Sequence, residues 1–248
     1  MHDASTRHLA LALLEQGLTL SQASRETGVS RSTLRAWRSD PRATERGTGC
    51  HLCASVPLDA PAYAALLGYY LGDGCLSRAQ RYWALRVSCD AKLPGIIDDV
   101  ARLITAVRPT GRVFRIRAPG VVVVQSHWQH WTCLFPQHGP GRKHQRPIVL
   151  EDWQRAIVEE QPGPFLRGLF HSDGCRARNW ARRTVAGVPK RYDYPRWQFT
   201  NVSTDIRELC CWALDMAEVP WRQSNATTIS VSRREAVARL DELIGPKR

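Results

Sequence analysis

The chain has 248 residues, which is enough for one large domain or for two unequal domains with a substantial core. Its 43% hydrophobic and 23% charged residues are ordinary for a globular protein and exclude wholesale disorder or a fibrous repeat. Thirty-five Lys and Arg against 23 Asp and Glu give a formal net charge of +12, which favours a polyanionic partner, nucleic acid before an anionic membrane.

Two features of the sequence bear on its compartment. The longest nearly apolar stretch, residues 63–72, is far shorter than the ~20 residues that cross a bilayer, and the N-terminus has no signal-peptide core. We therefore expect a cytoplasmic, nucleoid-associated bacterial protein with no membrane partner. In that compartment the eight cysteines are expected to be reduced thiols.

Residues 1–40 are predicted to form a small all-α helix-turn-helix domain. Gly28 suits the turn, Ser30 suits the N-cap of the second helix, and Leu34 and Trp37 lie on the inward face of that helix. A recognition helix presents its outer face to base edges and phosphates, and here that face carries Arg31, Ser32, Arg35 and Arg38. The alternative is a three-helix module that binds protein.

Residues 41–57 are polar and rich in structure-breaking residues, without apolar periodicity over a helical length, which predicts a linker. Within it, Cys50 and Cys53 have half of a zinc-ribbon spacing, but no second CxxC follows. A closed site would need help from the distant Cys133 or His138, so we do not expect zinc at Cys50 and Cys53. A second cluster, interleaved with tryptophan, proline and basic residues, is predicted to be a lobe-connecting loop near DNA rather than a metal site; it contains His127, His130, His138 and His144.

The remainder of the chain contains one pattern twice. Its two copies, one hundred residues apart, read AYAALLGYYLGDGC over residues 62–75 and PFLRGLFHSDGC over residues 164–175. Each copy is predicted to be a helix that has proline in its first turn and ends in Asp-Gly, where Gly74 or Gly174 suits a left-handed cap. The pattern indicates an internal duplication.

The same order of elements follows each helix. Alternating apolar residues and turn signals predict strands at residues 82–89, 113–117 and 121–125, and again at 176–183, 194–201, near Trp221 and near Ile229. Helices are predicted at residues 93–107, 151–160 and 205–217, and from a capping box at 232–235 to a stop before Gly245. The fold class is therefore α+β, with two αββαββα lobes at residues 58–150 and 151–248.

The nonamers LLGYYLGDG (residues 66–74) and LRGLFHSDG (residues 166–174) resemble the two copies of the LAGLIDADG signature of homing endonucleases. The resemblance covers about residues 58–248 and implies a single-chain, pseudo-two-fold monomer. It also implies one metal-coordinating catalytic acid per lobe, Asp73 and Asp173, with metal-bound water attacking the phosphodiester. The sixth position of the signature, often acidic in the family, is Leu71 or His171 here, and we expect His171 to be a partly buried helix residue.

Elementary physical chemistry agrees with these roles. Gly68 and Gly168 remove side chains where two helices would approach closely, and tight packing would offset the ~1 kcal/mol that a helical glycine costs. If the helices pack side by side, Asp73 and Asp173 meet at their C-terminal ends. Two carboxylates ~5 Å apart repel by roughly 3 kcal/mol at an effective dielectric of ~20, and negative helix ends add to this. Oxygen ligands of this kind suit Mg²⁺, with Mn²⁺ as a substitute.

Basic residues gather in two segments that are poor in acids. No acidic residue occurs between Asp99 and Glu151, and Asp193 is the only acid from Gly174 to Thr204. Alternation puts arginines on one face of each predicted strand, as expected for a β-ribbon in a DNA groove. The candidate DNA contacts are Arg115, Arg117, Arg176, Arg178, Arg182 and Arg196.

The sequence thus predicts a Mg²⁺-dependent endonuclease that hydrolyses double-stranded DNA. The alternative is a transcriptional regulator in which the LAGLIDADG-like domain binds DNA without cutting it, and the N-terminal DNA reader keeps this alternative open. Because both acids are present, the nuclease is favoured. The family often supplies a further lysine or glutamine near the acids; Asp90, Lys92 and Asn201 lie in the right region, but none of them is assigned that role.

Overall fold

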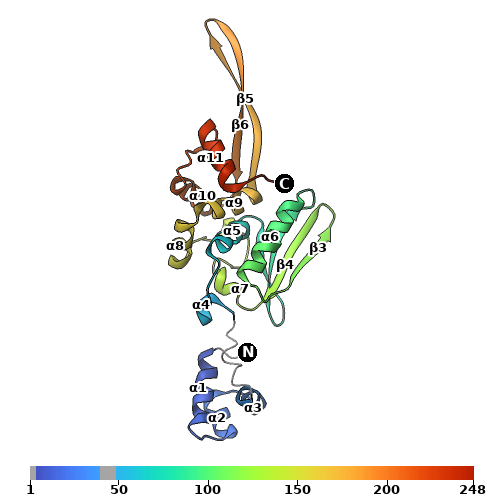
Figure 1. Cartoon of the computed structure of the whole chain (residues 1–248), viewed down its shortest axis with the longest axis vertical. Coiled ribbons are helices and arrows are strands. Elements are labelled where there is room, and N and C mark those ends of the chain that lie inside the picture. The colour runs from blue at the N-terminus through green and yellow to red at the C-terminus, as the bar shows by residue number, and fades with distance from the viewer. Residues whose placement is uncertain (1–3, 40–48) are drawn as a thin grey trace. The chain divides into compact units, whose positions relative to one another are not determined.

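The computed structural model describes residues 4–39 and 49–248, and the contacts between Cα atoms divide the chain into two compact units, Met1–Pro57 and Leu58–Arg248 (Figure 1). Of the predicted linker, residues 41–48 lie outside the described residues. Residues 49–57 contain a one-turn helix, α4 (His51–Ala54), which the sequence did not predict.

Unit one contains the predicted helix-turn-helix, formed by α1 (Ala4–Glu15), α2 (Leu20–Thr27) and α3 (Arg31–Ser39). Gly28 ends α2 with a left-handed φ of 69°, which glycine adopts without strain. The Ser30 Oγ accepts a hydrogen bond from the Thr33 amide at 3.2 Å and so caps the start of α3. A small apolar core holds the three helices together and consists of Ala10, Ala23, Val29 and Leu34.

Unit two contains two lobes with the same strand order. Lobe one runs through α5 (Ala60–Leu71), β1 (Gly74–Arg78), β2 (Trp83–Asp90), α6 (Pro94–Val107), β3 (Val113–Ala118) and β4 (Val121–Trp128). Its sheet is antiparallel with strand order β1-β2-β4-β3. The connection to lobe two contains α7 (Trp131–Leu134), the short 3₁₀ helix η2 (Lys143–Gln145) and α8 (Asp152–Glu160).

Lobe two repeats the arrangement with α9 (Pro162–Asp173), β5 (Gly174–Val185), β6 (Val188–Thr200), α10 (Thr204–Met216), β7 (Arg222–Asn225), β8 (Thr228–Val231) and α11 (Arg234–Ile244). Its antiparallel sheet has the matching order β5-β6-β8-β7. The predicted α+β class and the duplicated αββαββα order are confirmed. Among the described helices, none is both long enough and apolar enough to cross a membrane.

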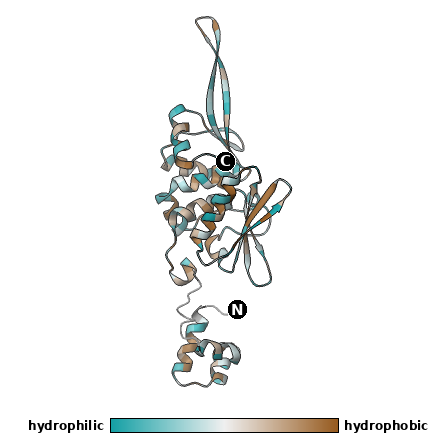
Figure 2. Cartoon of the chain, turned by 45° about the vertical axis from the view of Figure 1, so that its right-hand side comes forward, coloured by the Kyte–Doolittle hydropathy of each residue, from teal (hydrophilic) through white to brown (hydrophobic). Residues whose placement is uncertain are grey.

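The two lobes meet where α5 packs against α9. A Cβ atom added to Gly68 would lie 2.4 Å from the Phe165 carbonyl oxygen, and one added to Gly168 would lie 2.1 Å from the Ala65 carbonyl oxygen. Backbone therefore touches backbone at this crossing, and a side chain larger than hydrogen has no room. The rest of α5 is almost wholly buried, and apolar residues fill this centre of unit two (Figure 2).

The predicted left-handed caps at Gly74 and Gly174 are wrong. Each glycine is the first residue of a strand, β1 or β5, and neither has a positive φ; Gly174 is extended, with φ −94° and ψ 153°. The chain passes directly from helix to strand, so these glycines serve close packing instead. An added Cβ would lie 2.5 Å from the Tyr70 Cα at Gly74, and 2.4 Å from the Phe170 carbonyl oxygen at Gly174.

Two further local expectations need correction. The capping box at residues 232–235 does not form, because α11 begins one residue later, with Arg233 as N-cap and no side-chain cap. The β5–β6 hairpin is also longer than predicted. Ala186 and Gly187 have φ of 51° and 78° and close a two-residue turn, so the strands continue through residues 184–193, outside the two predicted strands, up to that turn.

The close contact of α5 and α9 at Gly68 and Gly168 leads to a first prediction. We expect Gly68→Ala and Gly168→Ala each to lower the free energy of unfolding by at least about 2 kcal/mol, because overpacking against backbone exceeds the ~1 kcal/mol gained in helix propensity. Urea unfolding followed by circular dichroism measures this. Gly163→Ala in the same helix α9 is the control, since its Cβ would meet only the flexible end of Leu243 at 3.1 Å. Equal stability of all three variants would contradict the account.

Candidate active site

The C-terminal ends of α5 and α9 bring Asp73 and Asp173 to one cavity of about 560 Å³. The two acids reach it from equivalent places, each followed by the glycine that begins a strand. The cavity is open on one side and also contains basic and polar side chains from the lobe connection and from the end of β6; these are His138, Arg142, Lys143, His144, Arg146 and Asn201.

The cavity disfavours ionisation of both acids. Burial, and then the neighbouring charge of Asp173, raise the pKa of Asp73 to about 6. Burial also raises the pKa of Asp173, against the opposing effect of a 2.7 Å hydrogen bond that the Asn201 Nδ2 donates to the Asp173 Oδ2. The site therefore brings two acids together in an environment that opposes their simultaneous ionisation.

Two lysines stand beside the acids, one per lobe. The Nζ of Lys143, in η2, donates hydrogen bonds to the carbonyl oxygens of Tyr70, Leu71 (2.9 Å) and Gly72 (2.8 Å) at the end of α5. The Nζ of Lys247, beyond α11, donates to the carbonyl oxygens of Ser172 (3.0 Å) and Gly174 (2.7 Å) at the end of α9. Each ammonium thus satisfies carbonyls that a helix end leaves unpaired and offsets the negative end of its dipole.

These lysines were not predicted from the sequence. Burial lowers the pKa of Lys143 to about 8 and also lowers the pKa of Lys247, although both acids oppose the shift. One signal could have found them: the chain has only four lysines against 31 arginines, and two of the four end the two lobes at corresponding places.

The site is not symmetric. Strand pairing matches Gly74 with Val87 and Gly174 with Phe199, so Cys89 in lobe one corresponds to Asn201 in lobe two. Asn201 hydrogen-bonds its acid, whereas the Cys89 thiol has a pKa raised to about 12 by burial and by Asp73. Of the three residues left unassigned, Asn201 therefore contacts an acid, while the Lys92 amide donates to the Asp90 Oδ1 at 2.9 Å.

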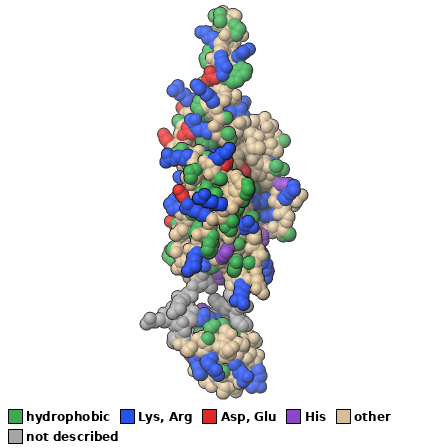
Figure 3. Space-filling model, turned by 90° about the vertical axis from the view of Figure 1, so that its right-hand side faces the viewer, with side chains coloured by type: hydrophobic (Ala, Val, Ile, Leu, Met, Phe, Trp, Pro, Cys, Tyr) green, Lys and Arg blue, Asp and Glu red, His purple; other side chains and the backbone are tan. Residues whose placement is uncertain are grey.

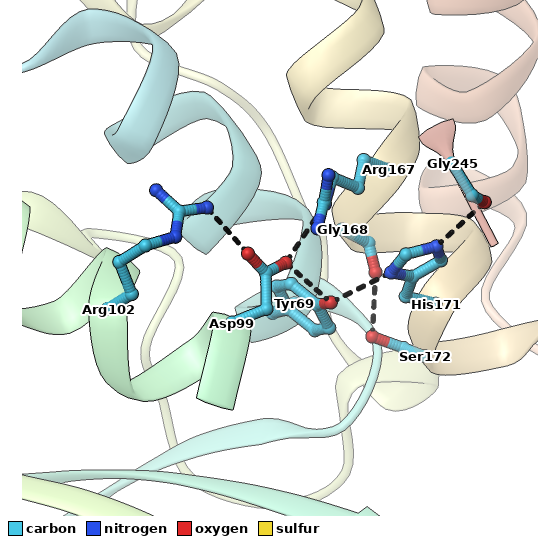
Figure 4. A network of polar contacts seen from close by, with 8 residues as sticks. All are labelled: Tyr69, Asp99, Arg102, Arg167, Gly168, His171, Ser172 and Gly245. Carbon is cyan, nitrogen blue, oxygen red and sulfur yellow. Dashed lines mark hydrogen bonds and ion pairs between the residues drawn. The ribbon is translucent and has the colours of Figure 1, made fainter. Parts of the chain in front are cut away.

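A polar network beside the seam explains His171. Its Nδ1 lies 3.0 Å from the Tyr69 hydroxyl, which donates to the Asp99 Oδ2 at 3.1 Å, and the Arg167 Nε donates to the same oxygen at 2.9 Å (Figure 4). Arg102 holds the other oxygen of Asp99 at 2.6 Å. Burial lowers the pKa of His171 to about 4, so the ring is neutral at pH 7. The network ties α5, α6 and α9 together, which is a packing role. Leu71, the matching position in lobe one, is fully buried.

The predicted recognition helix presents its cations to solvent. Arg31, Ser32, Arg35 and Arg38 are exposed on α3 and, together with residues at the start of α2, form a groove of about 790 Å³ within unit one.

The sheet arginines divide between two faces. Arg115 and Arg117 share the β3 face that α6 covers, where Arg115 pairs with Asp98 at 2.7 Å. Arg176 likewise lies on the helix side of β5 and pairs with Asp241 of α11 at 2.8 Å. Arg196 lies on the opposite, open face, held by the hydroxyls of Ser224 and Ser230. Arg178 is exposed, and Arg182 covers the ring of Trp180.

The open face of the lobe-one sheet carries an aromatic stack in place of the expected cations. His127 lies between Tyr82 and Phe114, with ring centroids 4.5 Å and 5.0 Å away. The Gln125 Nε2 lies 3.1 Å from the His127 Nε2. His138 instead meets Trp83 edge-on at 4.8 Å, so these two histidines of the predicted cluster pack against different aromatic rings.

The cysteines form no disulfide, and all eight lie in the described residues. In unit one, Cys50 is buried and Cys53 is exposed on the short α4, and burial raises the pKa of the Cys50 thiol. In unit two, the His130 Nδ1 lies 3.6 Å from the Cys133 Sγ. Either pair by itself offers two of the four ligands of a closed zinc site. The expectation of no zinc at Cys50 and Cys53 stays a prediction.

Comparison with known proteins identifies both folds. Residues 1–46 match the family model of a homeodomain-like domain. The chain resembles the homing endonuclease I-DmoI crystallised with DNA and Mn, at 11% identity over 75% of this chain and 98% of that chain, with a TM-score of 0.50. A variant of I-DmoI in complex with its target DNA in the presence of Mg is 10% identical over 75% of this chain and 96% of that chain, with a TM-score of 0.50. The N-terminal LAGLIDADG domain of WhiA is 14% identical over 76% of this chain and 83% of that chain, with a TM-score of 0.45.

No curated protein matches the sequence. Because identities near 11% establish the fold alone, the conclusion is architectural. The chain joins an N-terminal helix-turn-helix unit to a two-lobed LAGLIDADG fold.

The charge conflict between the acids predicts a pH-dependent stability. A folded-state pKa of about 6 for Asp73 is above its ordinary 3.8, so wild type loses stability relative to Asp73→Asn as pH rises from about 4 to 6. At pH 7 in EDTA we expect Asp73→Asn to unfold at a higher temperature than wild type. Thermal unfolding across pH measures this, with Glu159→Gln, an exposed carboxylate on α8, as a control within about 0.5 kcal/mol of wild type.

Bound Mg²⁺ should instead stabilise wild type. Millimolar Mg²⁺ is expected to raise the Tm of wild type and not that of the variant in which Asp73→Asn and Asp173→Asn are combined, because a ligand that binds only the folded state stabilises it. An equal Mg²⁺ response in the two proteins would contradict a site at these acids.

Proposed function

We propose that the chain is a divalent-metal-dependent DNA endonuclease in which Asp73 and Asp173, one from each lobe, hydrolyse phosphodiesters of double-stranded DNA. One observation carries the proposal: the ends of two duplicated helices bring one carboxylate each to a single open cavity, with a lysine ammonium at the end of each helix. Such a pair of like charges costs stability, so a structural role alone does not account for it.

The residues fit Mg²⁺. Carboxylate oxygens are the hard donors that Mg²⁺ prefers, with Mn²⁺ as a substitute. Burial and the charge of Asp173 raise the pKa of Asp73 although Lys143 and Lys247 oppose the shift, so a bound cation would relieve the remaining repulsion. When bound, the cation would lower the pKa of a water ligand and neutralise charge on the phosphate. Asp73 and Asp173 are the residues that would hold it.

The remaining side chains orient and compensate. Asn201 fixes the Asp173 carboxylate through a 2.7 Å hydrogen bond, while lobe one has Cys89 at the corresponding place. Lys143 and Lys247 are held against helix-end carbonyls and so present fixed positive charge beside the scissile phosphate, where negative charge develops. The two acids have different partners, so we expect the two DNA strands to be cut at unequal rates.

A regulator that binds DNA without cutting it is the second candidate. The homeodomain-like match over residues 1–46 and the exposed cations of α3 favour it, because such a reader suffices for operator binding. Retention of both acids together with both lysines favours the nuclease. On either reading the partner is double-stranded DNA, and the chain is proposed to act as a single-chain monomer.

Cleavage of plasmid DNA carrying the chain's own locus tests the proposal. Wild type with Mg²⁺ is expected to nick or cut the supercoiled plasmid, and EDTA, Asp73→Asn or Asp173→Asn is expected to abolish cutting while gel retardation persists. Glu159→Gln is the matched control and should cut normally. Retardation by wild type with no cut in Mg²⁺ or Mn²⁺ would favour the regulator.

The lysines make a separate prediction. Lys143→Gln and Lys247→Gln are expected to slow cleavage by about 10²-fold, because each removes one fixed charge that stabilises the transition state, and to leave DNA affinity nearly unchanged. Lys92→Gln, at an exposed lysine outside the cavity, is the control. Single-turnover rates and anisotropy titrations separate the two effects; equal rates for all three lysine variants would remove Lys143 and Lys247 from the mechanism.

A further inference from the structure

The β5–β6 hairpin extends far beyond the sheet of lobe two. β8 pairs with β6 only from Trp197 to Thr200, so the pairs from Ala177↔Arg196 out to Val185↔Val188 have no third strand. At ~3.3 Å per residue this two-stranded segment, which we call the arm (residues 177–196), is about 30 Å long. Figure 1 shows it projecting from the body of lobe two.

Lobe one has no such element. Its corresponding β1–β2 hairpin ends at the pair Arg78↔Trp83, and β4 covers β2 along its whole length from Trp83 to Asp90. The duplication has therefore diverged in one respect: only one lobe carries an arm.

The arm has no buried apolar face that would stabilise it by itself. Its residues are exposed or half-buried on both faces, and its polar length ends in an apolar tip at Val185 and Val188 (Figure 2). An isolated two-stranded hairpin is marginally stable at best in water. A partner that covers the arm would supply the missing stability.

The charges of the arm identify the partner. It carries six cations and one acid, Asp193, which is already paired with Arg191 at 2.8 Å; the cations are Arg178, Arg182, Arg183, Lys190, Arg191 and Arg196. Figure 3 shows Lys and Arg side chains along this projection. The excess fits a polyanion.

The register of β5 and β6 places cations directly opposite one another in the arm. Arg182 lies directly opposite Arg191, and Arg183 lies directly opposite Lys190. Like charges directly across an antiparallel pair are destabilising. Because consecutive pairs point to opposite faces, one cationic pair projects from each face of the ribbon. A ribbon lying on a flat anionic surface would use one face only, whereas a ribbon inside a groove meets phosphates on both sides.

Trp180 strengthens this reading. Its ring is 50% exposed, with the guanidinium of Arg182 at 5.5 Å and that of Arg191 at 5.3 Å from the ring centroid. The ring thereby holds both guanidinium groups on one face, where Asp193 pairs with Arg191 and Arg182 keeps its full charge. The arm is pre-arranged for anion contact.

We infer that the arm enters the DNA major groove and extends the contact on the lobe-two side alone, so that the bound site is asymmetric. The inference rests on the proposed DNA binding. A two-stranded ribbon fits the ~12 Å major groove, and its seven outer pairs, about 23 Å, span up to about 7 base pairs.

Two variants of the full chain test the inference. In one, Arg182→Gln, Arg183→Gln, Lys190→Gln and Arg191→Gln are combined. In the other, residues 179–194 are replaced by Asn-Gly, which closes a two-residue turn on the existing pair Arg178↔Pro195. The control removes four cations outside the arm, in α8 and at or within α11, with Arg155→Gln, Arg233→Gln, Arg234→Gln and Arg239→Gln combined.

The probes are a 40-base-pair duplex of random sequence and a long duplex. Fluorescence anisotropy across salt is expected to show the four-cation variant binding at least about tenfold more weakly, with a log–log salt slope smaller by about 2–4, because each phosphate contact contributes ~0.9. The shortened variant is expected to occlude up to about 7 fewer base pairs on the long duplex. The control should match wild type in DNA affinity and in salt slope.

The other outcomes overturn the inference. If wild type binds DNA and both arm variants bind identically, the arm is not a DNA contact, while the proposed function stands. Arm-dependent binding to phosphatidylglycerol vesicles, with DNA binding unchanged, would make the partner a membrane. If wild type fails to bind duplex DNA at all, both the arm inference and the proposed function fall.

Discussion

The contact between α5 and α9 at Gly68 and Gly168 is the constraint on which unit two depends. Because backbone meets backbone there, the two helices end side by side, and Asp73, just beyond α5, reaches the same cavity as Asp173, the last residue of α9. The sheets, the lysines and the arm are positioned relative to that crossing. Any side chain at these glycines would force the helices apart and separate the acids with them.

The cavity concentrates an electrostatic conflict that the surrounding structure only partly relieves. Lys143 and Lys247 compensate the helix ends, and Asn201 compensates one acid, yet the pKa of Asp73 still lies about two units above its ordinary value. A folded protein tolerates such a site when binding or catalysis needs it. The arm also carries like charges that a ligand would compensate. Its opposed cations weaken the free hairpin and become favourable against phosphates.

The sequence predicted what periodicity and duplication encode. The repeated nonamer, the order of elements along both lobes and the helix-turn-helix follow from spacing, because local pattern determines them. Lys143 and Lys247 could not be predicted this way, since each reaches a helix end more than 70 residues away in the sequence. Strand alternation grouped Arg115 with Arg117 correctly, but which face α6 covers is a tertiary fact. Gly74 was misread because it begins a strand and packs against Tyr70 in the last turn of its own helix, instead of capping that helix.

The central claim is that two lobes deliver one acid each to a shared divalent-metal site. The most direct measurement is a crystal structure of the full chain bound to duplex DNA in Mn²⁺, with anomalous scattering recorded for the metal. We predict an anomalous peak coordinated by the carboxylates of both Asp73 and Asp173 and by a phosphate oxygen. A structure in which these carboxylates point apart, or in which Mn²⁺ binds elsewhere and the cavity stays empty, would contradict the account.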